Sequence, residues 1–281
     1  MLDALLENEP YIRLSFFFGV LFVVAIWETL APRRQRTLTR LQRWPSNIGI
    51  VAINTLILRI LFPVAAVGMA FAASEKEWGL MHLLDLPPWL EILLAVILLD
   101  LAIYLQHVLV HAVPALWRLH RMHHADMDYD VTTGARFHPI EIIFSMVLKL
   151  GVVAAIGASP EAVIIFEVML NAMAMFNHGN ISLPPVLDKA LRFIVVTPDM
   201  HRVHHSIKVN ETNSNYGFNL PWWDRLFGTY RAQPTDGHKD MTIGLTQFRE
   251  TADQRLDRML LQPFQGETGT YPINRRTFDD G

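Results

Sequence analysis

The 281-residue sequence contains no cysteine. Disulfides, thiolate nucleophiles, cysteine-held iron–sulfur clusters and haem–thiolate ligation are therefore excluded. Charge is also scarce, since Asp, Glu, Lys and Arg make up 18% of the residues against 51% hydrophobic residues, and the mean hydropathy is +0.24. This composition is too apolar for an ordinary soluble domain of this size and indicates a membrane protein.

Long basic patches, glycine- or serine-rich linkers, low-complexity tracts and internal repeats are missing as well. Without a basic patch, a nucleic-acid partner is not expected. Without a linker or a repeat, the chain is expected to form a single folded unit.

The sequence has long apolar segments instead. A helix needs about 20 apolar residues to cross a bilayer. Five segments approach or exceed that length, and they cover residues 12–30, 47–73, 89–110, 140–158 and 160–176. Pro63 is expected to kink the second segment, and a short connection around Gly157 joins the last two as a helical hairpin. The sequence therefore predicts an all-α, multi-spanning helical membrane protein.

A basic loop after the first segment sets the expected orientation. It contains Arg33, Arg34, Arg36, Arg40 and Arg43. The positive-inside rule places such a loop in the cytoplasm. If each later apolar segment crosses the membrane once, residues 107–124 and all residues from His178 onward lie on the cytoplasmic side as well. Because the chain becomes polar from about Asn180, we expect a cytosolic, histidine-rich helical cap over the helix ends.

Most of the twelve histidines fall into three short clusters. The clusters follow the patterns HxxxH, HxxHH and HxxHH, and consist of His107 and His111; His120, His123 and His124; and His201, His204 and His205. Residues three and four apart share a helix face, so each cluster can direct at least two imidazoles to one point. More than four converging histidines exceed the needs of one tetrahedral zinc ion. The clusters therefore predict two metal ions rather than histidines that merely cap helix ends.

The other histidines differ in their surroundings. His178 emerges at the same membrane face as the clusters and is expected to be a further metal ligand. His138 opens the fourth apolar segment and is kept as a candidate ligand. His82 and His238 are expected to be ordinary surface residues.

Two carboxylates are candidates for orienting the ligands, because a metal-bound histidine usually donates its second N–H to an oxygen. Asp100 lies on the same helix face as His107, inside an apolar segment where an unpaired charge is costly. A polar contact between helices explains Asp100 equally well. Asp199, which lies shortly before the third cluster, is the second candidate, and no residue is assigned a direct catalytic role.

These patterns resemble the fatty acid hydroxylase superfamily, which includes the sterol desaturases. The resemblance runs from about Leu90 to His238 and is strengthened by three segments: NHGN from Asn177, TPDMHRVHH from Thr197, and NSNYGFNLPWWDRLFGTY from Asn213. The last segment looks like the tail of the bacterial branch. The resemblance implies N-terminal transmembrane helices over 1–89, a catalytic region over 90–238 and a C-terminal tail over 239–281, in a bacterial inner membrane with the histidines on the cytoplasmic side.

The resemblance also implies a di-iron centre that uses O2 to hydroxylate, or to desaturate, a C–H site of a sterol-like or fatty acyl lipid. Zinc is expected as a substitute metal in purified protein. The eight histidines of the three clusters match the family's ligands, His178 matches a further one, and His138 is a candidate tenth. Some members have another histidine four residues before the position of His178, where this sequence has Ala174, and this favours the sterol-desaturase-like branch.

The electrons must come from a separate donor, since the sequence shows no nucleotide-binding glycine motif and no haem or iron–sulfur signature. A reductase, a ferredoxin or a cytochrome is expected. Arg118, Arg121 and Arg202 lie beside the clusters and would suit an acidic carrier or lipid headgroups, but simple positive-inside charge is the favoured explanation of them.

Three other functions remain open. A desaturase differs from a hydroxylase only in the fate of the substrate radical. A non-catalytic membrane metal-binding or metal-transport protein is the alternative of another class, but transporters usually bind their ions near the middle of the bilayer. A zinc hydrolase is disfavoured because the sequence has no HExxH pattern.

Overall fold

The computed structural model describes residues 8–274, and this part of the chain is helical, with two isolated bridges and no extended strand. The longer helices are α2 (Glu9–Leu30), α3 (Arg40–Leu61), α4 (Ala65–Glu75), α5 (Pro88–Ala112), α6 (Pro114–His124), α7 (Pro139–Ile156) and α8 (Pro160–Asn177). The shorter ones are η1 (Leu80–Leu83), η2 (Thr133–Ala135), α9 (Pro185–Leu191), α10 (Pro198–His204), α11 (Val209–Thr212), α12 (Trp222–Leu226), α13 (Gly237–Asp240), η3 (Thr251–Gln254), α14 (Leu256–Leu261) and η4 (Gln262–Phe264). The predicted all-α class is confirmed.

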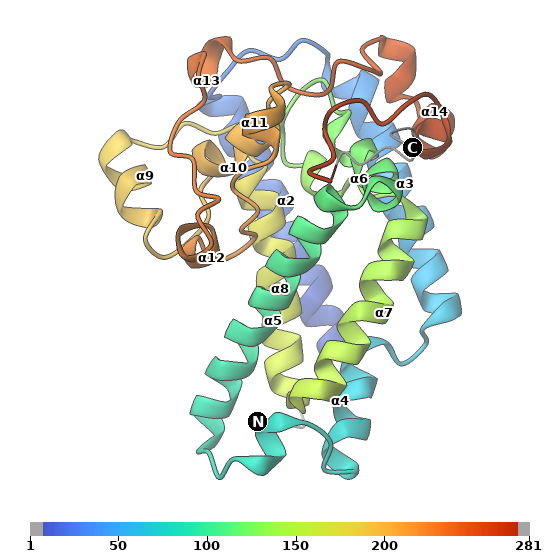
Figure 1. The fold of residues 1–281 in the computed structure, drawn as a ribbon, viewed down its shortest axis with the longest axis vertical. Helices are drawn as coiled ribbons and strands as arrows, with labels where there is room; N and C mark the ends of the chain where they lie inside the picture. Colours follow the sequence, from blue (N-terminus) through green and yellow to red (C-terminus); the bar gives the residue numbers. More distant parts are fainter. Residues whose placement is uncertain (1–7, 275–281) are drawn as a thin grey trace, which may run out of the picture.

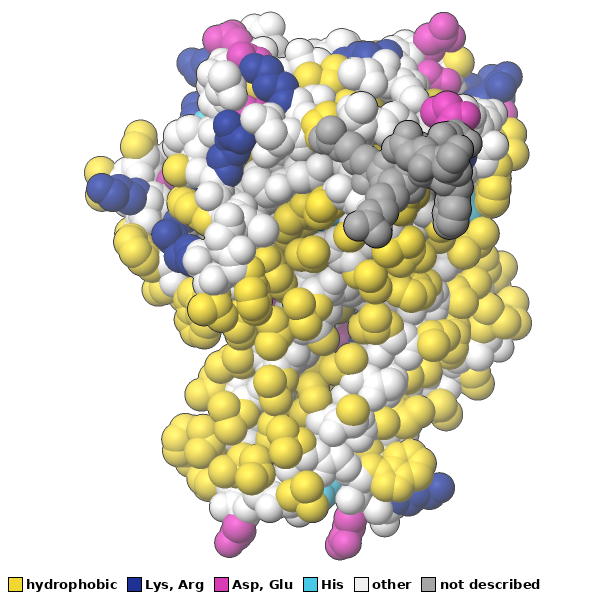
Figure 2. All heavy atoms as spheres, in the orientation of Figure 1, with side chains coloured by type: hydrophobic (Ala, Val, Ile, Leu, Met, Phe, Trp, Pro, Cys, Tyr) yellow, Lys and Arg dark blue, Asp and Glu magenta, His cyan; other side chains and the backbone are white. Residues whose placement is uncertain are grey.

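The long helices form one end of the molecule and the short ones form a cap at the other (Figure 1). Five helical segments are long and apolar enough to cross a membrane, and they correspond to the five segments predicted from the sequence. Hydrophobic side chains cover the helical end, while Lys, Arg, Asp and Glu gather on the cap and at the opposite tip (Figure 2). A lipid bilayer is the solvent that such a surface requires, and the chain is an integral membrane protein.

The second span is broken rather than kinked. Helix α3 ends at Leu61 and α4 begins at Ala65, so that Pro63 lies in the connection between them. Proline lacks the N–H of a helix interior and its ring collides with the preceding turn, which explains the break. The two helices together form one apolar segment over Arg40–Leu83.

Proline also begins most of the helices that position the cap. Six of them, α5 to α10, have a proline at one of their first two positions. The first helical N–H has no intrahelical acceptor, so proline costs nothing there and its fixed φ favours the helix. Ser159 and Thr197 cap α8 and α10 by accepting hydrogen bonds from backbone N–H groups. Helices α6 and α10 carry the second and third histidine clusters, so the prolines and the Thr197 cap determine where these two helices begin.

Two glycines close the end of the bundle opposite the cap. Gly157 ends α7 in the left-handed region, at φ 71°, and Gly79 has φ 96°. A Cβ on Gly79 would lie 2.2 Å from the backbone nitrogen of Gly157. The turn between α7 and α8 therefore packs backbone to backbone against the connection before α5, as only glycine allows.

The cap is tied to the start of α3 by a buried ion-pair network. The Arg43 guanidinium donates to both oxygens of Asp126, at 2.7 and 2.6 Å, and to Asp130 at 2.6 Å. Arg33 pairs with Asp199, and Arg40 with Glu28. Three arginines of the basic loop therefore form ion pairs within the protein, in addition to any effect of their charge on membrane orientation.

Candidate metal centre

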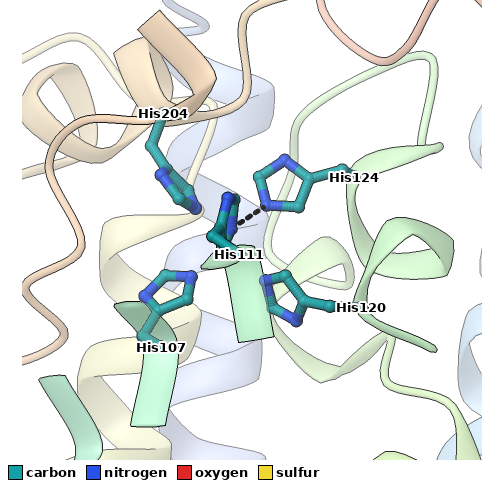
Figure 3. Close-up of side chains that lie close together, drawn as sticks. All are labelled: His107, His111, His120, His124 and His204. Atoms are coloured by element: carbon teal, nitrogen blue, oxygen red, sulfur yellow. Dashed lines mark hydrogen bonds between the residues drawn. The ribbon is translucent and has the colours of Figure 1, made fainter. Parts of the chain in front are cut away.

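Nine buried histidines form two groups at the cap end of the bundle. Within each group, one ring nitrogen of every residue lies within 4.8 Å of the others. The first group contains His107, His111, His120, His124 and His204, and the second contains His123, His178, His201 and His205. Figure 3 shows the rings of the first group converging from α5, α6 and α10.

Each HxxHH cluster contributes to both groups. His120 and His124 belong to the first group, while His123 belongs to the second. In the third cluster, His204 belongs to the first group and His205 to the second. Successive residues of an α-helix point about 100° apart, so adjacent histidines diverge while those four apart converge. The doubled histidine is thus what allows one short helix to contribute to both groups.

The spacing of the ring nitrogens suits metal coordination. The Nε2 atoms of His111 and His124 are 3.1 Å apart, and His178 Nε2 lies 3.2 Å from the Nε2 atoms of both His123 and His201. Two nitrogens bound to one ion at about 2.1 Å each lie roughly 3 Å apart. In the first group the Nε2 atoms of His107, His120 and His204 are buried and have no hydrogen-bond partner within the described chain.

The opposite ring nitrogen, Nδ1, is held by an oxygen in five of the nine histidines. Three Nδ1 atoms donate to backbone carbonyl oxygens: His107 to Tyr216 at 2.8 Å, His178 to Ala174 at 2.7 Å and His204 to Ser214 at 2.8 Å. Two donate to side chains: His111 to Asn213 at 3.2 Å and His120 to Glu141 at 2.6 Å. These hydrogen bonds fix the tautomer that leaves Nε2 available to a metal ion.

Burial keeps the cap histidines neutral, as metal binding requires. It lowers the pKa of His178 to about 4 and, together with the nearby His120, that of His204 to about 3. Burial, followed by the charge of the neighbouring imidazoles, also holds the pKa of His123, His124 and His205 well below the usual range. Near pH 7 these rings therefore carry a free lone pair and no proton that a metal ion would have to displace.

His138 lies outside both groups. Its Nδ1 accepts a hydrogen bond from the backbone N–H of Ile140 and so caps α7, while its Nε2 lies 3.3 Å from the carbonyl oxygen of Leu260. Both ring nitrogens thus have partners within the protein fold, and the geometry of the centre does not require this residue.

The two candidate carboxylates contact other residues in the described chain. Asp100 accepts hydrogen bonds from the indole N–H of Trp223 at 2.8 Å and from the backbone N–H of Leu220 at 3.3 Å, and so joins α5 to α12. Asp199 pairs with Arg33 and Arg202. The carboxylate that contacts a grouped histidine is Glu141, which the sequence analysis did not single out although it opens an apolar helix directly after His138.

The expectation that His238 is an ordinary surface residue is wrong. His238 is buried, 3.6 Å from Asp199, and burial lowers its pKa to about 3. Arg121 and Arg202 are also fully buried. Arg121 donates to carbonyl oxygens of the C-terminal segment, including that of Glu267 at 2.8 Å, so neither arginine is available to an electron carrier. His82 is exposed, as expected.

A cavity of about 290 Å³ leads from the histidines into the membrane-spanning part. His107, His120 and His123 line one end of it, and residues of α2, α3, α5, α7 and α8 line most of the rest. Apolar residues such as Phe17, Leu58, Ile103 and Leu170 form much of its wall. A hydrocarbon chain from the bilayer can therefore be accommodated beside both groups of histidines.

Known proteins that resemble this chain include a lipid hydroxylase and several monooxygenases by name. The model of the fatty acid hydroxylase family matches residues 92–229. The ornithine lipid hydroxylase OlsE of Rhizobium tropici is 31% identical over 238 residues, covering 82% of this chain and 70% of that protein. The chain belongs to the fatty acid hydroxylase family. Alkylglycerol monooxygenases share 30% identity in Xenopus tropicalis and 28% in Homo sapiens, over 66% and 60% of this chain.

The chain spans 41% of the frog and 36% of the human monooxygenase, and no solved structure matches it significantly. The relatives are named as hydroxylases and monooxygenases. The chain is therefore an oxidoreductase, and the comparisons disfavour a non-catalytic metal-binding or metal-transport protein. The family resemblance predicted from the histidine clusters is confirmed.

Glu141→Gln is expected to weaken iron binding about tenfold. The substitution keeps the shape but removes the charge that fixes His120 from 2.6 Å, and outer partners of this kind typically contribute 10- to 100-fold to metal affinity or activity. Iron affinity is measured by competition with a chelator. Glu161→Gln is the matched control, since Glu161 also lies in the first turn of a membrane-spanning helix but belongs to neither group of ligands. Equal affinities in both variants would contradict the role of Glu141.

Proposed function

We propose that this family member is a membrane monooxygenase in which two iron ions are held by the nine grouped histidines and which hydroxylates a C–H bond of a membrane lipid. The overall reaction is RH + O2 + 2 e⁻ + 2 H⁺ → ROH + H2O. The observation that carries the proposal is that two groups of buried neutral imidazoles, of five and four members, lie at the end of a cavity that reaches into the membrane-spanning helices.

The donor set favours iron as the working metal. Imidazole nitrogen suits iron, zinc and copper alike, but inserting oxygen into a C–H bond requires a metal that changes its oxidation state. Bound iron would supply the activation of O2 and the transfer of an oxygen atom to the lipid. We infer that His107, His111, His120, His124 and His204 hold one ion and that His123, His178, His201 and His205 hold the other.

The chain's own residues contribute burial, orientation and substrate placement. The grouped histidines are buried, which keeps bulk water from the reacting atoms. Glu141, Asn213 and three backbone carbonyl oxygens hold the imidazoles in one orientation. The cavity lets a lipid enter from the bilayer and places one of its carbons beside His107, His120 and His123.

The substrate is inferred to be a polar membrane lipid, since the relatives are named for an ornithine lipid and for alkylglycerols. These names also favour hydroxylation over desaturation. A separate reductase, ferredoxin or cytochrome supplies the electrons in this proposal. We place the protein in a bacterial inner membrane with the cap in the cytoplasm, because the basic loop after α2 lies on the cap side.

His124→Ala is expected to abolish a lipid product that is 16 mass units heavier than its precursor. His124 contributes to the first group through α6 and its Nε2 faces that of His111, so its loss removes a ligand from the proposed centre. Total lipids of aerated cells that express the native protein or the variant are compared by mass spectrometry. His82→Ala is the control, because His82 is exposed and outside both groups.

A lipid that gains one oxygen with the native protein and with His82→Ala, but not with His124→Ala, supports hydroxylation. A lipid that loses two hydrogens would instead establish a desaturase. Identical lipids in all three strains, with iron bound to the native protein, would reject the proposed function.

A further inference from the structure

An exposed apolar surface lies on the cap, on α9 with the residues that follow it and on α12. Figure 1 shows α12 beside α5, at the edge of the cap that faces the helical end, with α9 next to it. The indole N–H of Trp222 donates to the carbonyl oxygen of Phe193 at 2.8 Å, which joins the two segments. Seven large hydrophobic side chains, which we call the apolar patch, are 42% to 83% exposed there: Val186, Leu187, Phe193, Ile194, Trp222, Leu226 and Phe227.

The metal centre does not account for this surface. The segment from Asn213 that strengthened the family resemblance supports the histidines with its first residues, since Asn213 accepts from His111 and the carbonyl oxygen of Tyr216 from His107. The same segment then continues to Leu226 and Phe227, which are 70% and 53% exposed. Exposed apolar patches of this kind mark surfaces that contact a membrane or a partner. The second half of the segment therefore serves a different contact from the first.

Contacts with α5 show how deep α12 lies. The indole N–H of Trp223 donates to Asp100 at 2.8 Å, and the ring of Phe227 stacks on that of Tyr104 with centroids 5.5 Å apart. Trp89, which is 66% exposed, begins α5 at its other end, where aromatic residues typically mark the membrane surface. At about 1.5 Å per residue, Asp100 and Tyr104 lie about 17 and 22 Å from Trp89 along the helix axis. The hydrocarbon layer is about 30 Å thick, so the part of α5 that α12 contacts falls within it.

The charges around the apolar patch are of one sign. Lys189 on α9 and Arg225 on α12 are exposed. In the described stretches 182–194 and 220–231 the acidic residues are Asp188 and Asp224, and both are buried. Apolar side chains bordered by lysine and arginine are typical of segments that lie in the membrane interface, where the cations meet anionic headgroups. The outer surface of α9 and α12 therefore has the charge that a membrane leaflet requires.

We propose that the apolar patch is inserted into the leaflet on the cap side of the bilayer, among the acyl chains next to the headgroups, with Lys189 and Arg225 at the level of the lipid phosphates. Figure 2 supports this placement, because hydrophobic side chains cover this edge of the cap and continue onto the membrane-spanning end. The bilayer that surrounds the spanning helices thus extends under part of the cap. This proposal does not depend on the hydroxylation reaction.

The insertion has a consequence for the metal centre. Asp224 on α12 accepts hydrogen bonds from the backbone N–H groups of Tyr216 and Gly217, at 2.8 Å each. The carbonyl oxygen of Tyr216 in turn accepts from His107 Nδ1 at 2.8 Å. A short chain of contacts therefore connects the inserted helix to a grouped histidine. The apolar patch would hold the histidines at a fixed depth, close to the lipids of that leaflet.

The absence of cysteine from the sequence allows a direct test of the insertion. Val186→Cys and Leu226→Cys each introduce a single thiol at a side chain that is 83% or 70% exposed, so the substitution does not disturb the packing. Each full-length variant is labelled with a bimane fluorophore and reconstituted into phosphatidylcholine nanodiscs. The label is then quenched either by a lipid that carries a nitroxide on its acyl chain or by iodide in the water.

Two further variants provide the reference values. Leu56→Cys places the label on membrane-spanning α3, at a side chain that is 61% exposed, and Lys239→Cys places it at an exposed position of α13 on the cap. We expect the labels at Val186 and Leu226 to resemble that at Leu56, with strong quenching by the nitroxide lipid and several-fold weaker quenching by iodide than at Lys239. Strong quenching by iodide would overturn the proposal. Protection from both quenchers would also overturn it, because a protein such as a second copy of the chain would then cover the patch.

The headgroup contact is tested with nitroxide lipids that share their acyl chains and carry either phosphatidylglycerol or phosphatidylcholine. Lys189 lies three residues after Val186, on the same face of α9. We expect the label at Val186 to be quenched about two- to fivefold more strongly by the anionic lipid. Lys189→Gln should reduce this difference, and Lys239→Gln should not. Equal quenching by the two lipids before either substitution would overturn the assignment of Lys189 to anionic headgroups. The label reports position without iron or O2, so the result is independent of the His124→Ala lipid test.

Discussion

Removal of the metal is expected to abolish lipid hydroxylation and to lower the unfolding temperature, and only iron is expected to restore both. The nine grouped histidines are buried, and the Nε2 atoms of His107, His120 and His204 have no hydrogen-bond partner in the described chain. An unpartnered buried polar atom typically costs about 1–3 kcal/mol. The metal-free protein is therefore either less stable, because these nitrogens stay without partners, or it rearranges its cap.

Metal that binds only the folded state stabilises it by about 4 kcal/mol per site when its free concentration is 1,000 times the dissociation constant. Two sites would thus produce a large shift of the unfolding temperature. Zinc also accepts imidazole ligands, so it should restore the unfolding temperature without restoring activity, because it does not change its oxidation state. Unfolding is followed by circular dichroism and activity by lipid mass spectrometry. Full activity of the zinc-loaded protein would contradict the redox role of the metal.

The features that the sequence predicted are local and periodic. The five membrane-spanning segments follow from runs of apolar residues, whose length is set by the bilayer rather than by any tertiary contact. The convergence of His107 with His111, of His120 with His124 and of His201 with His205 follows from helical spacing. In both cases the pattern and the structure depend on neighbouring residues alone.

The division of the histidines between two groups was not predicted, although helix geometry contains it. His123 and His124 are adjacent, so they point in different directions and reach different groups. Knowing which partner each would meet requires the positions of α5, α8 and α10. Those positions depend on packing between segments distant in the sequence, on which the clusters themselves carry no information.

The groups that orient the imidazoles were missed for a related reason. Three of them are backbone carbonyl oxygens, of Tyr216, Ala174 and Ser214, and a carbonyl oxygen has no residue-type signal. Asn213 reaches His111 from a loop far along the chain. Asp100 was a reasonable candidate because it is charged within an apolar segment, but its Oδ2 accepts hydrogen bonds from Trp223 and Leu220 rather than from a grouped histidine.

The basic loop shows how one residue pattern can have two physical causes. Five arginines after the first span suggested a charge that orients the chain in the membrane. In the structure, Arg43 is buried between Asp126 and Asp130, and Arg33 pairs with Asp199. Composition could not separate the two causes, because the partner carboxylates lie in the loop after α6 and in α10.

Arg43→Met is expected to destabilise the protein by about 3–5 kcal/mol, the usual cost of removing one partner from a buried ion pair. The side chains of Arg43, Asp126 and Asp130 are completely buried, so the variant leaves two carboxylates without their shared guanidinium, and Arg136, 3.8 Å from Asp126, remains beside one of them. Asp126 follows shortly after His124, and its loop continues to η2. There Gly134 packs against the carbonyl oxygen of Ala174, so the loop lies close to α8 as well as to α6. We therefore expect the variant to lose iron as well as stability.

The free energy of unfolding is measured by denaturant titration in micelles. Arg255→Met is the matched control, since Arg255 pairs with Asp257 at the surface, where the side chains are 70% and 58% exposed, and such pairs contribute about 1 kcal/mol or less. Adding Asp130→Asn to Arg43→Met removes the carboxylate whose ion pair was with Arg43, while Asp126 keeps Arg136 nearby, and should recover part of the loss, as expected for residues in one network. A loss below about 1 kcal/mol for Arg43→Met, equal to that of the control, would show that the cap is held to α3 mainly by its apolar contacts.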